Sequence, residues 1–235
     1  MRWLIEPRNQ SSLPVMGIEG RFAVGNIFCV GRNYADHAVE MGGDPVREPP
    51  FFFIKPSFTL LEPGYDMVYP DHSTNVHHEV ELVVALGRSG RRTPVEGAME
   101  LVYGYAVGID MTRRDLQSAA KEKRQPWEAG KSFVHAAPCS AITPVQEAGL
   151  IEDAMICLSV NEQVRQSGFI NQMIWKIPEI ISRLSDMFPL SAGDLIYTGT
   201  PAGVGPIEIG DELQANISGL SRLTFKITVP NNSIS

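Results

Sequence analysis

The sequence predicts a single β-rich α+β domain with short peripheral helices. Three observations favour this class. The apolar segments are short and rich in Val, Ile and aromatic residues, as strands are. Glycine (21 residues) and proline (17 residues) are frequent and indicate many turns. Strands and helices do not alternate regularly along the 235 residues, which disfavours a parallel βαβ fold.

The first half of the chain is predicted to be mostly strands. Residues 1–22 are expected to form a short N-terminal strand or hairpin, and residues 23–235 the main catalytic domain. A short helix of about two turns is expected at 34–41, because Gly42-Gly43 follows it. The strands predicted in this half are 27–31, 51–54, 78–86 and 102–109.

The second half is predicted to contain two helices among further strands. Residues 113–123 favour a helix, with Ala119 and Ala120 at its centre. Pro178 fits the first turn of a helix that runs to about residue 187 and keeps its apolar residues on one face. The predicted strands are a hairpin of 157–161 and 164–166 across Asn161-Glu162-Gln163, and closing strands at 195–198, 212–217 and 223–229.

Composition and charge exclude several classes of function. The chain has 20 Lys+Arg against 27 Asp+Glu, a net charge of −7, and no basic cluster, which disfavours nucleic-acid binding. No apolar run approaches the ~18 residues of a membrane span, and Glu6-Pro7 interrupts any signal peptide. The three cysteines (Cys29, Cys139 and Cys157) are far apart, which favours reduced thiols in a cytoplasmic protein.

Two glutamates stand two residues apart at the start of the predicted strand 78–86. Alternate residues of a strand project from one face, so Glu79 and Glu81 are expected to point the same way. Adjacent carboxylates repel unless a proton or a cation bridges them, and oxygen ligands suit hard ions such as Mg²⁺ and Mn²⁺. The pattern is typical of a metal site or, alternatively, of an exposed polar face. A helical zinc motif is excluded because position 82 holds Leu.

Asp110 follows the predicted strand 102–109 and is a third candidate ligand. Alone, an aspartate at the exit of a strand is typical of a turn or a helix cap. With Glu79 and Glu81 it would complete a set of three carboxylates that leaves positions open for a substrate. The candidates for holding an anionic substrate lie downstream: Arg114, Gln117 and Lys131, although each alone is more typical of a solvated surface.

His37 and Glu40 are three residues apart on the predicted helix 34–41, so their side chains can meet. A carboxylate orients an imidazole and raises its basicity, which suits a general base acting on water. The alternative is an exposed helix pair without a catalytic role.

The segment 198–205 is a glycine-rich loop after a predicted strand. It lacks the lysine of a phosphate-binding loop, and no helix pattern follows it, so phosphate binding is disfavoured. Its glycines would let backbone amides approach a small ligand closely.

Four motifs together resemble the fumarylacetoacetate hydrolase family. They occur in family order, and the resemblance spans residues 23–230 roughly. Two segments, 47–56 and 112–117, are most similar to bacterial fumarylpyruvate hydrolases. The four motifs are Cys29-Val30-Gly31-Arg32-Asn33-Tyr34-Ala35-Asp36-His37, His77-His78-Glu79-Val80-Glu81-Leu82, Asp110-Met111-Thr112-Arg113-Arg114-Asp115 and Thr198-Gly199-Thr200-Pro201.

The resemblance implies a mixed β-roll fold, a homodimer and a small anionic keto-acid substrate. It implies Mg²⁺ or Mn²⁺ held by Glu79, Glu81 and Asp110. Three catalytic residues are implied: His37, Glu40 and Lys131. The implied substrate contacts are Arg32, Arg114, Gln117, Lys131 and Thr200.

The predicted activity is the metal-dependent cleavage of the carbon–carbon bond of an acylpyruvate such as fumarylpyruvate. His37, oriented by Glu40, would deprotonate a water, and Lys131 with Gln117 would stabilise the resulting oxyanion. The same site could instead decarboxylate oxaloacetate, or isomerise or tautomerise a keto acid. A catalytically silent binding protein is the remaining alternative, and the intact dyad and carboxylates argue against it.

Overall fold

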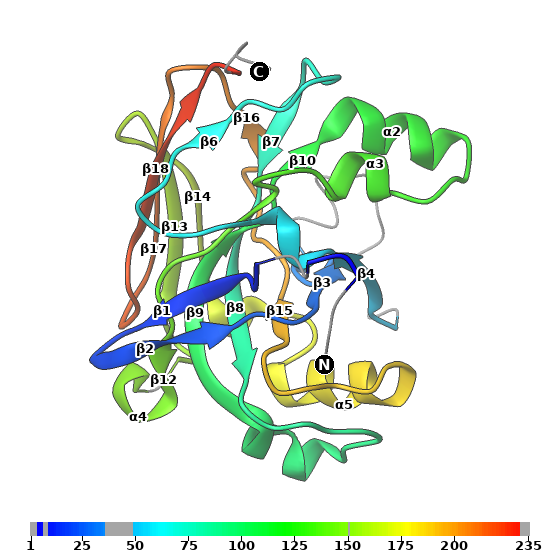
Figure 1. Ribbon diagram of the computed structural model, residues 1–235, viewed down its shortest axis with the longest axis vertical. Helices are drawn as coiled ribbons and strands as arrows, with labels where there is room; N and C mark the ends of the chain where they lie inside the picture. The colour runs from blue at the N-terminus through cyan, green and yellow to red at the C-terminus, as the bar shows by residue number, and fades with distance from the viewer. Residues whose placement is uncertain (1–3, 7–8, 36–48, 150, 231–235) are drawn as a thin grey trace.

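The computed structural model describes residues 4–6, 9–35, 49–149 and 151–230 (Figure 1). Most of the predicted helix at 34–41, including both His37 and Glu40, lies outside the described residues.

A mixed six-stranded sheet crosses the centre of the molecule. The long strand β8 (Val80–Leu86) pairs antiparallel with β9 (Val102–Ile109) on one side and with β15 (Leu195–Tyr197) on the other. Beyond β15, the strand β3 (Ile27–Gly31) runs parallel to it. The edges of the sheet are β12 (Thr143–Pro144) and β4 (Phe51–Lys55).

A five-stranded sheet covers one face of the central sheet and lies at the left of Figure 1. The main apolar core joins the two sheets, because it contains residues of β8 together with residues of β13 and β17. In order across the sheet, the strands are β14 (Gln163–Phe169), β13 (Met155–Val160), β17 (Glu212–Ile217), β18 (Leu223–Thr228) and β6 (Met67–Val68).

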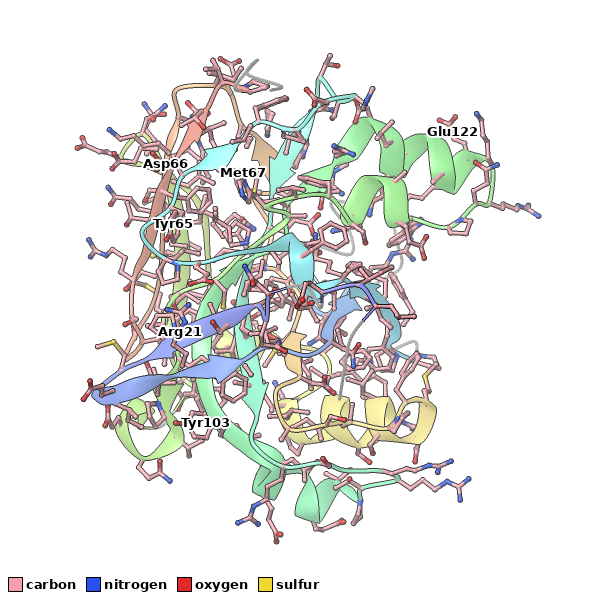
Figure 2. The ribbon with its side chains drawn as sticks, viewed as in Figure 1. Arg21, Tyr65, Asp66, Met67, Tyr103 and Glu122 are labelled. Carbon is pink, nitrogen blue, oxygen red and sulfur yellow. The ribbon has the colours of Figure 1, made fainter. Side chains whose placement is uncertain are left out.

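Both faces of β8 are buried, which explains why its sequence is apolar at every position except Glu81. Val80, Leu82 and Val84 point into the main core. Val83 and Ala85 point the other way, into a second core that includes Leu13 and Val15 of the N-terminal hairpin. That hairpin consists of β1 (Ser12–Val15) and β2 (Ile18–Ala23). Figure 2 shows Tyr103 below it, where the tyrosine ring lies 5.4 Å from that of Phe22.

Short elements complete the fold around these sheets. The small sheets are β10 (Thr112–Arg113), β7 (Val76–His78) and β16 (Gly205–Pro206), and the parallel pair β5 (Leu60–Leu61) with β11 (Ala137–Pro138). The α-helices are α2 (Arg114–Glu122), α3 (Glu128–Lys131), α4 (Val145–Ala148) and α5 (Ile177–Met187). The 3₁₀ helices are η1 (Ser57–Thr59), η2 (Val95–Leu101) and η3 (Ile170–Gln172).

The helices lie at the periphery. In Figure 1, α2 and α3 lie together at one end of the molecule and α5 near the opposite end. None of the helices in the described ranges is both long and apolar enough to cross a membrane.

The predicted β-rich α+β class is confirmed, and most strands and the helices α2 and α5 begin and end within a few residues of their predicted bounds. The hairpin of β13 and β14 is confirmed, although its turn is Asn161-Glu162 alone, both at positive φ (49° and 66°). The expected boundary between residues 22 and 23 stays a prediction.

The prediction of one continuous strand over residues 78–86 is wrong, because the strand is interrupted at Glu79. β7 pairs with β10 and β16, whereas β8 pairs with β9 and β15, so the chain changes partners at this residue. The Val80 amide donates to the side chain of Gln166 instead of to a strand.

Candidate metal and substrate site

Strand pairing brings three carboxylates together. Glu81 lies in β8, Glu79 in the interruption before it, and Asp110 directly after β9. β8 and β9 are antiparallel, with Glu81 opposite Gly108, and the Asp110 amide donates to the Glu79 carbonyl (2.8 Å). One carboxylate oxygen from each residue lies within 4.8 Å of the other two. All three side chains are buried, so the alternative of an exposed polar face is wrong.

The glycine-rich loop after β15 orients Glu81. The Gly199 amide donates to Glu81 Oε2 (2.7 Å). Gly199 has φ of 98°, and a Cβ atom there would lie 2.7 Å from Asn33 Cβ, so the position requires glycine. The sequence led us to expect a loop amide facing a ligand, whereas this one binds a candidate metal ligand. Burial, Asp110 and Glu79 raise the pKa of Glu81 well above its usual value.

Three cations balance the three carboxylates. Lys131 Nζ lies 2.8 Å from Glu79 Oε2 and 2.6 Å from Asp110 Oδ2. Arg114 forms an ion pair with Glu79 Oε1, and Lys55 Nζ lies 2.8 Å from Asp110 Oδ1. Counted with every group ionised, the cluster is neutral. Such balance is what buried charges require, because an unpaired ion in the interior is costly.

Lys55 is a part of the site that the sequence did not indicate. Its side chain is fully buried, and its ammonium donates to the backbone carbonyls of Met111, Lys131 and Ala136. These three acceptors use all three N–H bonds of the ammonium group. Its contact with Asp110 Oδ1 is therefore purely ionic, and this oxygen is buried without a hydrogen-bond donor.

Lys131 also uses all its donors within the site. Besides the two carboxylates, its ammonium donates to Thr112 Oγ1 (2.7 Å). Burial disfavours the charged form, but Asp110 and Glu79 outweigh it and raise the pKa of Lys131, so the residue remains an ammonium ion. Lys131 can donate to a substrate oxygen only when one of its present contacts is given up.

Helices α2 and α3 place the predicted substrate residues. Arg114 and Gln117 are three residues apart on α2, and Arg114 Nη1 donates to Gln117 Oε1 (2.7 Å), which leaves the Gln117 NH₂ group as its donor. Gly130 in α3 allows the close approach of the two helices. A Cβ atom there would lie 2.9 Å from the Gln117 backbone nitrogen. This approach puts the next residue, Lys131, against the carboxylates.

A buried glutamine behind the site holds Thr200. Gln166 Nε2 donates to Thr200 Oγ1 (2.8 Å), while Gln166 Oε1 accepts from the Val80 amide and from His78 Nδ1. Because Oε1 can only accept, the proton of His78 lies on Nδ1. The Thr200 oxygen accepts the bond from Gln166, so its hydroxyl proton can still be donated. Among the described residues its one acceptor is the Pro201 carbonyl, at 3.5 Å. The hydroxyl can therefore donate into the pocket.

One pocket collects these groups. Its lining contains every predicted metal and substrate residue that the structure describes: Arg32, Glu79, Glu81, Asp110, Arg114, Gln117, Lys131 and Thr200. Phe51, Phe53, Lys121 and Trp127 also line it. The sequence indicates no role for these four residues. Only Lys121 carries a signal, which is its four-residue spacing from Gln117 on one face of α2. The dyad of His37 and Glu40 lies outside the described residues.

The chemistry of the three carboxylates fits a divalent metal ion. They offer oxygen atoms only, as Mg²⁺ and Mn²⁺ prefer. They lie closely enough to share one ion, and Asp110 Oδ1 is buried without a hydrogen-bond donor. Glu79, Glu81 and Asp110 are therefore the residues that would hold Mg²⁺ or Mn²⁺.

Comparisons with known proteins identify relatives of this chain. The profile of the family described as Fumarylacetoacetate (FAA) hydrolase C-terminal matches residues 26–228. The human protein named Oxaloacetate tautomerase FAHD1, mitochondrial is 44% identical over 205 residues, which cover 87% of this chain and 92% of that protein. Fumarylpyruvate hydrolase of Ralstonia sp is 43% identical over 184 residues, which cover 78% of this chain and 95% of that protein.

A solved structure is similar over nearly the whole length. The crystal structure of fumarylpyruvate hydrolase from Pseudomonas aeruginosa in complex with Mn²⁺ and pyruvate has a TM-score of 0.94 and 44% sequence identity. The match covers 97% of this chain and all of that chain.

Proposed function

The chain belongs to the fumarylacetoacetate hydrolase family, and from this premise we propose that it is a metal-dependent acylpyruvate hydrolase. It would cleave a substrate such as fumarylpyruvate to pyruvate and a carboxylic acid. The observation that carries the proposal is the buried cluster of Glu79, Glu81 and Asp110 with its three paired cations. The similarity to two fumarylpyruvate hydrolases supports it.

The charge of the site supports an anionic keto acid as the substrate. The cluster of three carboxylates and three cations is formally neutral, so a divalent ion would leave two uncompensated positive charges in a buried place. A negative ligand would remove this excess, and a 2-oxo acid offers a carboxylate and a neighbouring keto oxygen to one ion. When bound, Mg²⁺ or Mn²⁺ would act as a Lewis acid that polarises the substrate carbonyl.

The residues of the chain would supply binding and proton transfer. The Gln117 NH₂ group and the Thr200 hydroxyl have donors that can reach substrate oxygens, and Arg114 holds Gln117 in place. His37, oriented by Glu40, would take a proton from the water that attacks the distal carbonyl. Breaking the carbon–carbon bond would then release the acid and the enolate of pyruvate, which would take up at carbon the proton that His37 removed from the water. No nucleophilic serine or cysteine is required.

Oxaloacetate tautomerisation or decarboxylation is the second candidate function. The human relative named an oxaloacetate tautomerase is as similar to this chain as the fumarylpyruvate hydrolases are. Oxaloacetate is also a 2-oxo acid, so the same binding groups suit it. The predicted homodimer and the cytoplasmic location remain proposals drawn from the family and from composition.

A turnover panel tests the proposed function. Metal-stripped protein is assayed with fumarylpyruvate, acetylpyruvate and oxaloacetate, alone and with Mg²⁺ or Mn²⁺ added. Pyruvate release and loss of the enol absorbance are followed separately, so that hydrolysis, decarboxylation and tautomerisation are distinguished. We expect acylpyruvate hydrolysis that depends on added metal. Metal-dependent turnover of oxaloacetate without acylpyruvate cleavage would replace the proposal by the second candidate.

Lys131→Met tests whether this residue takes part in the reaction. We expect kcat for acylpyruvate to fall by about 10²-fold at saturating Mn²⁺, as the loss of one oxyanion donor typically does. The matched control is Lys226→Met, which removes a lysine that is 63% exposed, and it should keep wild-type kinetics. A rise in KM with unchanged kcat would show that Lys131 binds substrate and transition state equally.

A further inference from the structure

One face of α2 carries a further basic residue beyond the groups that surround the carboxylates. Arg114, Gln117 and Lys121 are separated by three and four residues, which places them on one face of the helix. All three line the same pocket. Lys121 follows Arg114 by seven residues, or about 10 Å along the helix axis. Figure 2 shows its neighbour Glu122 near the outer end of the helix. Lys121 therefore lines a part of the pocket that lies further along the helix axis than Arg114.

Lys121 and Arg32 form no ion pair with another described residue, unlike the three cations of the cluster. The ion pairs of the pocket involve Arg114, Lys131 and Lys55 instead. Lys121 Nζ lies 5.1 Å from the ring centroid of Trp127. The guanidinium of Arg32 lies 5.9 Å from the ring centroid of Phe51.

The two rings form a shared wall. The rings of Phe51 and Trp127 meet edge to face, with 5.3 Å between their centroids. Contacts with ring faces do not use the N–H donors, so both cations keep donors for a ligand.

Positive charge gathers at Lys121 and Arg32. Burial and the positive charges of Arg114 and Arg32 lower the pKa of Lys121, and the opposing effect of Glu79 does not cancel them. Arg32 has a backbone φ of 57°, in the left-handed region that residues other than glycine rarely adopt.

We propose that Lys121 and Arg32 form a second anion subsite, which binds a carboxylate at the end of the substrate opposite its keto-acid group. The inference rests on the proposed function and assigns a further specificity-determining residue to it, because fumarylpyruvate and oxaloacetate both carry a second carboxylate. Lys121 is thereby the residue that separates these substrates from acylpyruvates with an apolar end, which the Phe51 and Trp127 rings alone would contact.

The test measures binding and does not depend on which reaction is catalysed. Mn²⁺-loaded protein is titrated calorimetrically with 2-oxoglutarate and with 2-oxopentanoate, which has the same carbon chain but a methyl group in place of the distal carboxylate. We expect the wild type to prefer 2-oxoglutarate by about 10- to 100-fold, the range for a hydrogen bond between charged groups. Lys121→Met should bring this preference close to one while leaving 2-oxopentanoate binding unchanged.

Lys123→Met is the matched control, because it removes an exposed lysine from the same end of α2, outside the pocket. It should retain the full preference. Equal binding of the two acids by the wild type, or an undiminished preference in Lys121→Met, would overturn the subsite and leave the proposed function standing. If the Mn²⁺-loaded wild type binds neither acid, the subsite is overturned, and the turnover panel decides the proposed function separately.

Discussion

Glu81→Gln is expected to abolish Mn²⁺ binding and catalytic activity while the protein stays folded. The change removes one of three anionic ligands and keeps the shape of the side chain. The new amide oxygen can still accept the hydrogen bond from the Gly199 amide. It also removes a charge from a place where burial and two neighbouring carboxylates already disfavour it, so folding should lose little stability.

Calorimetric titration with Mn²⁺ and a thermal melt measure this result independently. At an ion concentration of one hundred times Kd, a ligand stabilises the native state by about 2.7 kcal/mol. For a chain of this size that raises Tm by about 5 to 10 °C. The wild type should show this rise and Glu81→Gln should not.

Glu96→Gln serves as the charge-matched control, since Glu96 is exposed in η2. It should behave as the wild type in both measurements. Unchanged Mn²⁺ affinity in Glu81→Gln would remove Glu81 from the set of ligands.

The metal ligands could be predicted from the sequence because a strand has a fixed side-chain period. Glu79 and Glu81 are two residues apart, and Asp110 ends a strongly apolar segment, so sheet formation alone makes their meeting plausible. The interruption at Glu79 could not be predicted in this way. It depends on Gln166, which is 86 residues away and takes the Val80 amide.

Lys55 and Lys121 show where sequence reasoning fails at the site itself. Lys55 lies between a predicted aromatic strand and Pro56, and nothing in the sequence marks it as part of the site, yet it is fully buried beside Asp110. Its position depends on three carbonyls from distant segments, at Met111, Lys131 and Ala136, and no local pattern records them. Lys121 is signalled only by its helical spacing from Gln117, which any exposed helix face would share.

The role of Gly130 also depends on a contact between distant segments that the sequence does not show. In the sequence it is one of 21 glycines, and nothing there distinguishes it. In the structure it faces the backbone of Gln117, at a distance that leaves no room for a side chain. The placement of Lys131 in the site thus depends on a contact between two helices that the sequence does not reveal.

His37→Ala is expected to lower acylpyruvate hydrolysis by about 10²- to 10⁴-fold, the usual contribution of a general base. Hydrolysis requires a water to lose a proton as it attacks the carbonyl. Decarboxylation of oxaloacetate requires no water, only a bound metal ion and a correctly oriented carboxylate. Because Glu79, Glu81 and Asp110 remain, any decarboxylation should survive better than hydrolysis in the same variant.

The measurement is pyruvate release from fumarylpyruvate and from oxaloacetate at saturating Mg²⁺, with the wild type beside His37→Ala. His72→Ala is the matched control, since His72 is exposed and lies outside the pocket, and both of its rates should equal those of the wild type. Mn²⁺ affinity measured on each variant shows that the carboxylates are intact, so a loss of hydrolysis with normal metal binding assigns the defect to the base. If fumarylpyruvate is still hydrolysed at the wild-type rate, His37 does not activate the water, and the proton must go to another group in the pocket.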